Sequence, residues 1–214
     1  MLNLRIIEEQ GWVEFEGVSS TDDLVSIANQ IGNVKPHPNG EVVFSLVPSN
    51  GERCNKGTFS NIYGYSEFPL HTDTAFWSTP ARYLVLGMID KSSCNTHIIS
   101  FSDVLAEMEE QILKCAKNSI YIINTFEGKK FTSAYFKNGS QAGFRFDPNC
   151  MTPVNRYAKL FHVEFLACLK KINPKPIAWT GNKAVVLDNW RTLHGRESVS
   201  HLDRNRKLMR VYTG

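Results

Sequence analysis

The sequence has few of the features that mark membrane, exported or disulfide-linked proteins. No stretch approaches the ~18 uncharged apolar residues of a transmembrane helix, and Glu8 and Glu9 fall where a signal peptide would carry its apolar region. The five cysteines are odd in number, widely spaced and without a C-x-x-C pair, which argues against a disulfide framework and a cysteine zinc site. We therefore expect a cytoplasmic protein with free thiols and no membrane partner.

An excess of charge and the motifs of nucleotide-binding proteins are also missing. The net charge is +3, from 24 Lys and Arg against 21 Asp and Glu, which is too small to indicate nucleic-acid binding by itself. The absence of a G-x-G-x-x-G segment and of a phosphate-binding loop weighs against nucleotide-binding folds. The 214 residues are enough to bury one core and show no repeat or linker, so residues 1–214 are predicted to form a single domain.

What the sequence does contain is an irregular succession of short apolar strands and three helices. Helices are predicted over 21–31, 102–117 and 153–172, the first capped by Ser20 or Thr21 and ended by Gly32. Strands are predicted over 82–89, 96–100, 119–125, 130–136, 143–147, 183–188 and 207–212. Segment 33–57 is rich in Pro, Gly and Asn and is expected to be a long loop with a short strand inside it. This pattern favours a mostly β protein with flanking helices (α+β), a jelly roll rather than a doubly wound sheet.

The sharpest local feature is His71-Thr72-Asp73, within the segment EFPLHTDTAFW. Residues i and i+2 of a strand point to the same side, so an extended chain would present the His71 imidazole and the Asp73 carboxylate to one point. These are two of the three ligands of the 2-His-1-carboxylate site that binds non-haem Fe(II). The tripeptide alone occurs often by chance, and a surface histidine beside an acid explains it equally well.

Two later segments carry side chains that could complete such a site. Segment 185–197, VVLDNWRTLHGRE, is an apolar strand followed by a polar cluster with His194, although a turn stabilised by Asp188 with His194 in solvent is the alternative. Arg206 and Arg210 are separated by three residues, so on a strand they share one face. Two guanidiniums on one face beside a metal would bind a carboxylate, whereas a solvated basic strand end is the alternative.

Together, PLHTDTAFW, VLDNWRTLHGR and DRNRKLMRVY resemble the taurine dioxygenase family (TauD/TfdA) of Fe(II)- and 2-oxoglutarate-dependent oxygenases. They occur in the family's order, and GWVEFEGVSSTDDLVSIANQIG resembles its opening strand and helix. The resemblance implies a double-stranded β-helix, the clavaminate synthase-like jelly roll. The chain is shorter than most members and lacks much of the insert that builds their substrate lid, so segment 33–67 or a partner chain is expected to replace it.

The resemblance also implies roles for individual residues. The iron ligands of the catalytic centre would be His71, Asp73 and His194. Arg206 would pair with the distal carboxylate of 2-oxoglutarate, and Thr96 matches a threonine that helps to hold it, although the usual Gly-Gly-x-Thr reads Ser-Cys-Asn-Thr here. Arg210 matches a second arginine near the other end of the co-substrate or near the substrate.

The reaction that the resemblance implies uses O2 and 2-oxoglutarate and releases succinate and CO2. It oxidises an unactivated C–H bond of a small molecule, by hydroxylation or a related step such as desaturation. Halogenating relatives lack the carboxylate ligand and so leave room for chloride. The presence of Asp73 therefore predicts hydroxylation or a related oxidation.

Residues that would contact the substrate are predicted on less specific grounds. The candidates are Tyr63, Phe76, Arg145 and Glu67. Phe76 and Trp77 alternate faces, so only one of them is expected to point inward, and core packing is the alternative for both. Arg145 and Arg210 could clamp the carboxylate of an amino acid or of a natural-product intermediate derived from one, and Glu67 its cation.

Three other interpretations stay open. An AlkB-like oxidative nucleic-acid demethylase shares the H-x-D…H frame, and Arg204 and Arg210 have its arginine spacing, but the segment DNWRTLHGR and the small net charge favour the first resemblance. A zinc hydrolase could use the same ligands but gives no reason for Arg206 and Thr96. The third is a jelly-roll binding module that has lost catalysis. A homo-oligomer is expected if a partner chain completes the site.

Overall fold

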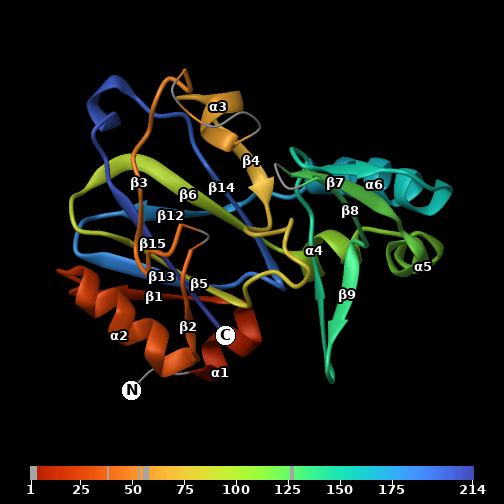
Figure 1. The fold of residues 1–214 in the computed structure, drawn as a ribbon, viewed down its shortest axis with the longest axis horizontal. Helices are drawn as coiled ribbons and strands as arrows, with labels where there is room; N and C mark the ends of the chain where they lie inside the picture. Colours follow the sequence, from red (N-terminus) through yellow and green to blue (C-terminus); the bar gives the residue numbers. More distant parts are fainter. Residues whose placement is uncertain (1–3, 38, 53, 55–57, 126–127) are drawn as a thin grey trace.

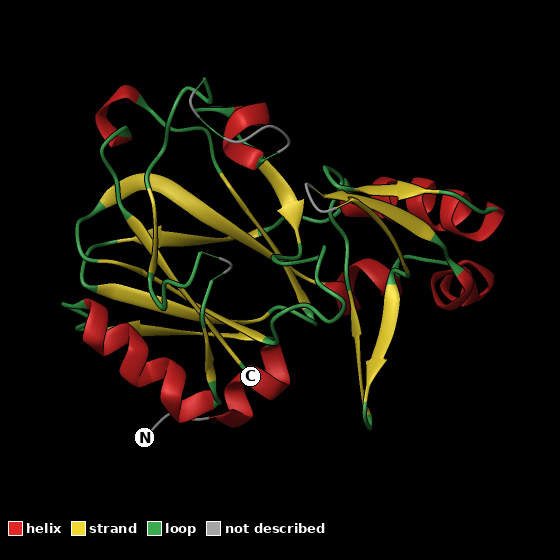
Figure 2. Ribbon diagram, viewed as in Figure 1, coloured by secondary structure: helices red, strands yellow, loops and turns green. Residues whose placement is uncertain are grey.

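The fold consists of two antiparallel β-sheets that face each other and a smaller lobe of helices and short strands beside them (Figures 1 and 2). The computed structural model describes residues 4–37, 39–52, 54, 58–125 and 128–214. The predicted loop 33–57 therefore lies partly outside the described residues, and its described part contains β2 (Val34–Lys35) and β3 (Phe44–Leu46). No helix in the described ranges is long and apolar enough to span a membrane.

The larger sheet has the strand order β1-β13-β5-β15-β2, with β3 also paired to β15. Its other strands are β1 (Trp12–Glu16), β13 (Lys183–Asp188), β5 (Tyr83–Met88) and β15 (Leu208–Thr213). Alternate side chains face opposite ways: Leu84 and Tyr212 pack toward the second sheet, whereas Val85 and Val211 pack beneath helices α1 (Leu4–Gln10) and α2 (Thr21–Ile31).

The second sheet has the order β12-β6-β14-β4. Its strands are β12 (Lys175–Trp179), β6 (Ser92–Ser100), β14 (Thr192–Arg196) and β4 (Phe68–His71). Ile98 and Ile177 from its inner face join Leu84, Leu86 and Tyr212 in the core between the sheets. The predicted class, mostly β with flanking helices, is confirmed by this pair of sheets.

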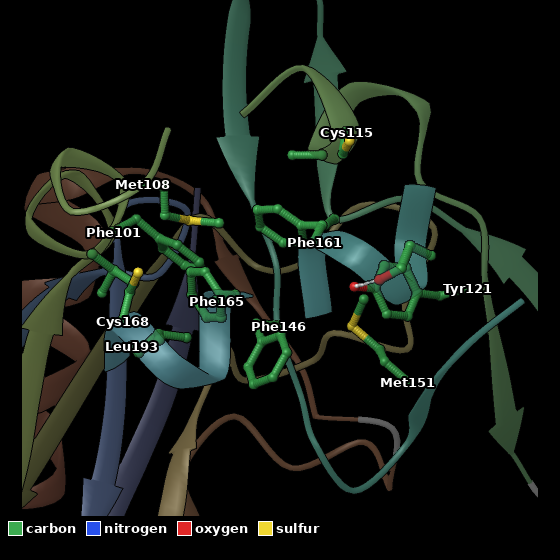
Figure 3. Close-up of a cluster of buried hydrophobic side chains, with 14 of the residues drawn as sticks. Phe101, Met108, Cys115, Tyr121, Phe146, Met151, Phe161, Phe165, Cys168 and Leu193 are labelled. Carbon is green, nitrogen blue, oxygen red and sulfur yellow. Dashed lines mark hydrogen bonds between the residues drawn. The ribbon is translucent and has the colours of Figure 1, made fainter. Parts of the chain in front are cut away.

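The smaller lobe lies between β6 and β12 in the sequence. It comprises α4 (Phe101–Ala106), α5 (Glu110–Asn118), β7 (Tyr121–Thr125), β8 (Gly128–Thr132), β9 (Tyr135–Asn138), β10 (Gln141–Phe144), β11 (Met151–Pro153) and α6 (Arg156–Leu169). Its core contains Phe146, Phe161 and Phe165, and Leu193 of β14 belongs to the same cluster (Figure 3). The lobe therefore packs on one face of β14 while the sheet interior lies on the other.

Helix α2 is the element that the sequence specifies most fully. The Ser20 hydroxyl accepts from the Asp23 N–H at 3.2 Å, and the Asp23 carboxylate accepts from the Ser20 N–H at 2.9 Å, which completes a capping box. Gly32 follows the last helical residue, and Leu24 and Ala28 are buried. The predicted helix 21–31 is confirmed at both ends.

Two predicted helices differ from the structure. The helix predicted over 102–117 is two helices, α4 and α5, because the chain is extended at Glu109 (φ −64°, ψ 145°) and both halves pack against α6. The helix predicted from Pro153 begins instead at Arg156. Pro153 pairs with Tyr121 in β11, and the Asn155 side chain caps the helix.

Two predicted strands are also shorter or divided. The strand 130–136 is split between β8 and β9, because the Ser133 hydroxyl and the Ala134 N–H turn to hydrogen-bond the end of α5 and the residue after it. The strand 143–147 ends at Phe144. Residues 145–147 instead run beside Thr72, whose N–H donates to the Phe146 carbonyl at 2.8 Å.

The capping box of α2 gives a test of the fold. We expect Ser20→Ala to lower the free energy of unfolding by about 1 kcal/mol, because the side-chain acceptor for an N-terminal N–H is lost. Urea unfolding followed by circular dichroism measures the change. Ser20→Asn keeps an acceptor and is expected to stay within about 0.3 kcal/mol of the unmodified chain; an equal loss for both variants would contradict this account.

Candidate active site

The two predicted histidine ligands are paired across neighbouring strands. His71 at the end of β4 is the register partner of His194 in β14, and their ring centroids lie 4.5 Å apart. The His71 Nδ1–H donates to the Pro69 carbonyl at 2.9 Å, so Nε2 is the ring nitrogen left to bind a metal ion. Phe59 of α3 (Phe59–Tyr63) stacks on the His71 ring with centroids 4.2 Å apart.

His194 is buried and neutral. Burial and then the neighbouring His71 lower the pKa of His194 to about 3, so the ring carries no proton charge at neutral pH. Its Nδ1 atom has no hydrogen-bond partner among the described residues. Neutral imidazole is the form that binds a metal ion.

The Asp73 carboxylate is held by two side chains of β15 and by the backbone of the next residue. Its Oδ2 accepts from Arg210 Nη1 at 2.6 Å, and its Oδ1 accepts from the Tyr212 hydroxyl at 3.2 Å and the Thr74 N–H at 2.9 Å. Burial favours the protonated form, but Arg210, His194 and then His71 outweigh it and hold the pKa of Asp73 at about 2. The carboxylate is therefore ionised.

The backbone of Asp73 is fixed by the polar cluster that precedes β14. Asn189 Oδ1 accepts from the Asp73 N–H, and Asn189 Nδ2 donates to the Asp73 carbonyl, both at 2.9 Å. Asp188 forms a 3.0 Å ion pair with Arg82, and Trp190 Nε1 donates to the Pro80 carbonyl. Asp188, Asn189 and Trp190 therefore connect the end of β13 to the loop that carries Asp73, through buried hydrogen bonds and an ion pair.

Arg210 and its neighbours form the wall of the site on β15. Besides Asp73, the Arg210 guanidinium donates through Nη2 to His37 Nε2 at 3.0 Å. The His37 ring stacks on Phe44 with centroids 4.2 Å apart, and burial and then Arg210 lower the pKa of His37. Segment 33–67 thus contributes His37 to this wall and Phe59 to the His71 side.

Arg206 lies beside Cys94, near the start of β6, whereas His194 pairs with Ile98 near the end of that strand. Only 6 % of its surface is exposed. Nη1 donates to the Cys94 sulfur at 2.8 Å, whereas Nε and Nη2 have no hydrogen-bond partner among the described residues. Burial lowers the pKa of Arg206. Thr96 is two residues after Cys94 on the same buried face of β6, and its hydroxyl accepts from Trp179 Nε1 at 3.1 Å, which leaves the hydroxyl proton free to donate.

The loop before Arg206 is fixed by Asp203. Its carboxylate accepts from the Ser92 hydroxyl at 2.6 Å, the Ser93 N–H at 3.0 Å and the Ser200 hydroxyl at 2.8 Å. Burial opposes ionisation, but these serine donors outweigh it and hold the pKa of Asp203 at about 2. Asp203 therefore ties the residues around Arg206 to the start of β6.

The donor types are those of a 2-His-1-carboxylate iron site: two imidazoles, of which His194 is neutral, and one ionised carboxylate. As the side chains stand, no three His, Cys, Asp or Glu residues in the described part of the chain are arranged to hold a metal ion. Asp73 is directed to Arg210 and Tyr212. A carboxylate accepts about four hydrogen bonds and Asp73 receives three, so one acceptor position stays open. The donor types of these residues therefore fit Fe(II).

The residues predicted to contact the substrate lie at different places. The Arg145 guanidinium donates to the carbonyls of Ala75, Trp77 and Ser78 at 2.7–3.1 Å, so it braces the turn after Asp73 and is not free to clamp a carboxylate.

The aromatic and acidic candidates are placed as follows. Phe76 packs on the core of the smaller lobe. Trp77 faces the core between the two sheets, where its ring centroid lies 5.5 Å from that of Tyr212. Tyr63 stacks with Phe59 rather than with a histidine ring, and Glu67 is exposed.

Several site residues were missed in the sequence. Arg196 and Cys94 are each two residues from a predicted site residue on the same strand, so alternation alone could have indicated them. The Arg196 guanidinium donates to the carbonyls of Gly64 and Ser66 and so holds the chain before β4. Tyr212 is likewise two residues after Arg210 on one strand. His37 lies in an irregular segment where no periodic signal exists.

Comparison with known proteins gives a fold but no family. No family model matches the chain, and no curated protein matches its sequence. Among solved structures, the chain is similar to asparagine oxygenase in complex with Fe(II), 2S,3S-3-hydroxyasparagine and succinate, with a TM-score of 0.81 and 15 % identity over 98 % of this chain and 76 % of that one.

Two further structures are similar over the same extent. The non-haem iron oxygenase OrfP in complex with Fe and α-ketoglutaric acid has a TM-score of 0.75 at 15 % identity, over 98 % of this chain and 76 % of that one. PvcB from Pseudomonas aeruginosa has a TM-score of 0.71 at 18 % identity, over 98 % and 78 %. The chain thus has the jelly-roll fold of these iron oxygenases.

The Asp203 cluster gives a test by pH. The pKa of Asp203 lies below its unfolded value of about 3.9, so the stabilisation by its carboxylate is present above about pH 4 and is lost as the pH falls toward 2. We expect Asp203→Asn to lower the free energy of unfolding by about 1–3 kcal/mol at pH 7. Urea unfolding across pH 2–7 measures the difference between the two proteins, which is expected to shrink below pH 4; a difference that grows in acid would contradict the assignment.

Proposed function

We propose that the chain is an Fe(II)- and 2-oxoglutarate-dependent oxygenase of the taurine dioxygenase type. The observation that carries this proposal is Arg206, a buried guanidinium with two unpartnered nitrogens among the described residues. A buried charge without a counter-ion costs several kcal/mol, and a carboxylate is the anion that fits a planar guanidinium on two oxygens. The distal carboxylate of 2-oxoglutarate supplies such an anion.

The ligands of the metal would be His71, Asp73 and His194. When bound, Fe(II) with 2-oxoglutarate and O2 supplies the oxidation of an unactivated C–H bond, with release of succinate and CO2. The chain fixes the Asp73 backbone through Asn189 and sets the His71 tautomer through the Pro69 carbonyl. Both contacts would hold the donors in an orientation suited to Fe(II).

The co-substrate would lie between Arg206 and the histidine pair. Arg206 and the Thr96 hydroxyl would donate to its distal carboxylate, and Arg210 adds a second cation beside Asp73. A site with more guanidinium than carboxylate charge suits a dianion. The same excess of positive charge would not help a zinc hydrolase, because a neutral substrate and water would leave Arg206 without an anionic partner.

For the substrate we propose a free amino acid or an amino-acid-derived intermediate. Support comes from the structurally similar proteins, which include asparagine oxygenase and OrfP in complex with (3S)-hydroxy-L-Arg. Arg210, whose guanidinium lies on the wall formed with His37, is the candidate for the substrate carboxylate; Arg145 no longer qualifies. The five cysteines are free thiols, which supports a reducing, cytoplasmic compartment.

An anaerobic absorbance titration tests the cofactor assignment. Fe(II) followed by 2-oxoglutarate is expected to give the visible charge-transfer band of an iron-bound 2-oxo acid. Arg206→Ala is expected to raise the 2-oxoglutarate concentration needed for half of this band by about 100-fold, because a charge-assisted contact on two oxygens is lost. Addition of single amino acids then screens for a substrate by the shift of the band.

Arg204→Ala is the matched control for this titration. Arg204 is exposed and its guanidinium lies over the Tyr65 ring, so its loss is expected to leave the band unchanged. A folded, iron-loaded protein that gives no band would contradict the oxygenase proposal, and turnover that needs neither O2 nor 2-oxoglutarate would favour a zinc hydrolase.

The carboxylate of Asp73 predicts the type of product. With a substrate identified, reaction in the presence of chloride is expected to give hydroxylated or desaturated product and no chlorinated product, because Asp73 occupies the position that chloride would need. Mass spectrometry of the products distinguishes these outcomes. A chlorinated product would show that Asp73 is not an iron ligand.

A further inference from the structure

Cys94 occupies an unusual position beside Arg206. It lies on the inner face of β6, 2 % exposed, and its sulfur is 2.8 Å from Arg206 Nη1. The same sulfur carries a thiol proton that is donated to the Glu197 carbonyl at 3.3 Å. Burial raises the pKa of the Cys94 thiol despite the nearby guanidinium, so the thiol stays protonated. Its lone pairs are then the acceptor for the Arg206 N–H.

The contact between Cys94 and Arg206 Nη1 leaves one edge of the guanidinium free to bind a ligand. A guanidinium binds a carboxylate on two oxygens through a pair of nitrogens that share an edge. Nε and Nη2 form such a pair, and they are the two Arg206 atoms without a partner among the described residues. Nη1, which lies outside this edge, is the atom that Cys94 holds. The cysteine therefore fixes the rotation of the Arg206 plane.

We propose that Cys94 is a positioning residue of the co-substrate site, whose sulfur turns the Nε–Nη2 edge of Arg206 toward a carboxylate of the ligand. This inference rests on the proposed function. It predicts that the hydrogen-bond acceptor at position 94, and not only its volume, determines the affinity for a dicarboxylate. Asp203 and Glu197, the nearest carboxylates that influence Arg206, form no ion pair with it among the described residues, so no protein carboxylate replaces the ligand.

The test compares two substitutions at position 94 that separate the acceptor from the packing. Cys94→Val fills the space but cannot accept a hydrogen bond, whereas Cys94→Ser keeps an acceptor. We expect Cys94→Val to bind 2-oxoglutarate about 10-fold more weakly than the unmodified chain and Cys94→Ser to stay within about 3-fold. Thermal unfolding in EDTA with increasing 2-oxoglutarate measures binding without any turnover, because a ligand that binds only the folded state raises the Tm by an amount set by the ratio of its concentration to its Kd.

Cys168→Val is the matched control. Cys168 is also buried and donates to a backbone carbonyl, that of Glu107 at 3.5 Å, but it lies in the core of the smaller lobe. Its loss is expected to lower the Tm without changing the affinity for 2-oxoglutarate. The comparison therefore separates loss of a buried thiol from loss of the contact with Arg206.

The outcomes distinguish this inference from the proposed function. If Cys94→Val binds 2-oxoglutarate as tightly as the unmodified chain while Arg206→Ala does not bind it, Cys94 has no positioning role and the oxygenase proposal stands. If Cys94→Ser is as weak as Cys94→Val, the acceptor is not what matters and the inference is wrong. If 2-oxoglutarate does not stabilise the unmodified chain in EDTA at any concentration, the Arg206 edge alone does not bind a dicarboxylate and the Cys94 inference is wrong; the oxygenase proposal fails with it only if Fe(II) and 2-oxoglutarate also give no charge-transfer band.

Discussion

The position of β14 between β4 and β6 is the constraint on which the site depends. Residues opposite each other in antiparallel strands face the same side of the sheet. His194 is therefore aligned with His71 on one neighbour, and Arg196 with Thr96 on the other. Leu193, the residue directly before His194, faces the core of the smaller lobe instead. A shift of one residue would exchange these two sets and remove the imidazole from the interior.

The interior also has to accommodate buried charge. Arg210 and Asp73 satisfy each other at 2.6 Å, and this pair remains ionised although both groups are buried. Arg206 has no carboxylate partner among the described residues; its hydrogen-bond partner there is the Cys94 thiol. Arg206 thus has two buried nitrogens without a partner among the described residues, and the free energy of burying its charge would be offset when an anion binds.

Much of the fold could be predicted from the sequence, because the signals were local. The helix 21–31 carries its own caps, and the strands 82–89, 183–188 and 207–212 are apolar runs between turn residues. The break of helix 102–117 could not be predicted, since it follows from how both halves pack on α6.

The site divides in the same way. Strand alternation and motifs led to His71 and Arg206, and in the fold His71 pairs with His194 while Arg206 is buried beside Cys94; their roles as ligands stay predictions. Arg145 was not predicted correctly, because the three carbonyls that occupy it become neighbours only in the folded chain. His37 was missed for the same reason: its partner Arg210 is far away in the sequence.

The Asp203 cluster has a further consequence for local stability. The histidines are on strands whose backbone hydrogen bonds belong to the central sheets, so their order is lost only when the sheet opens. The chain around Arg206 is held at its start mainly by one carboxylate and the serines around it. Segments of this kind exchange their amide hydrogens through local opening at a lower free energy than the sheet does. We therefore expect the loop that carries Arg206 to open locally while the strands that carry the imidazole pair, Cys94 and Thr96 stay in place.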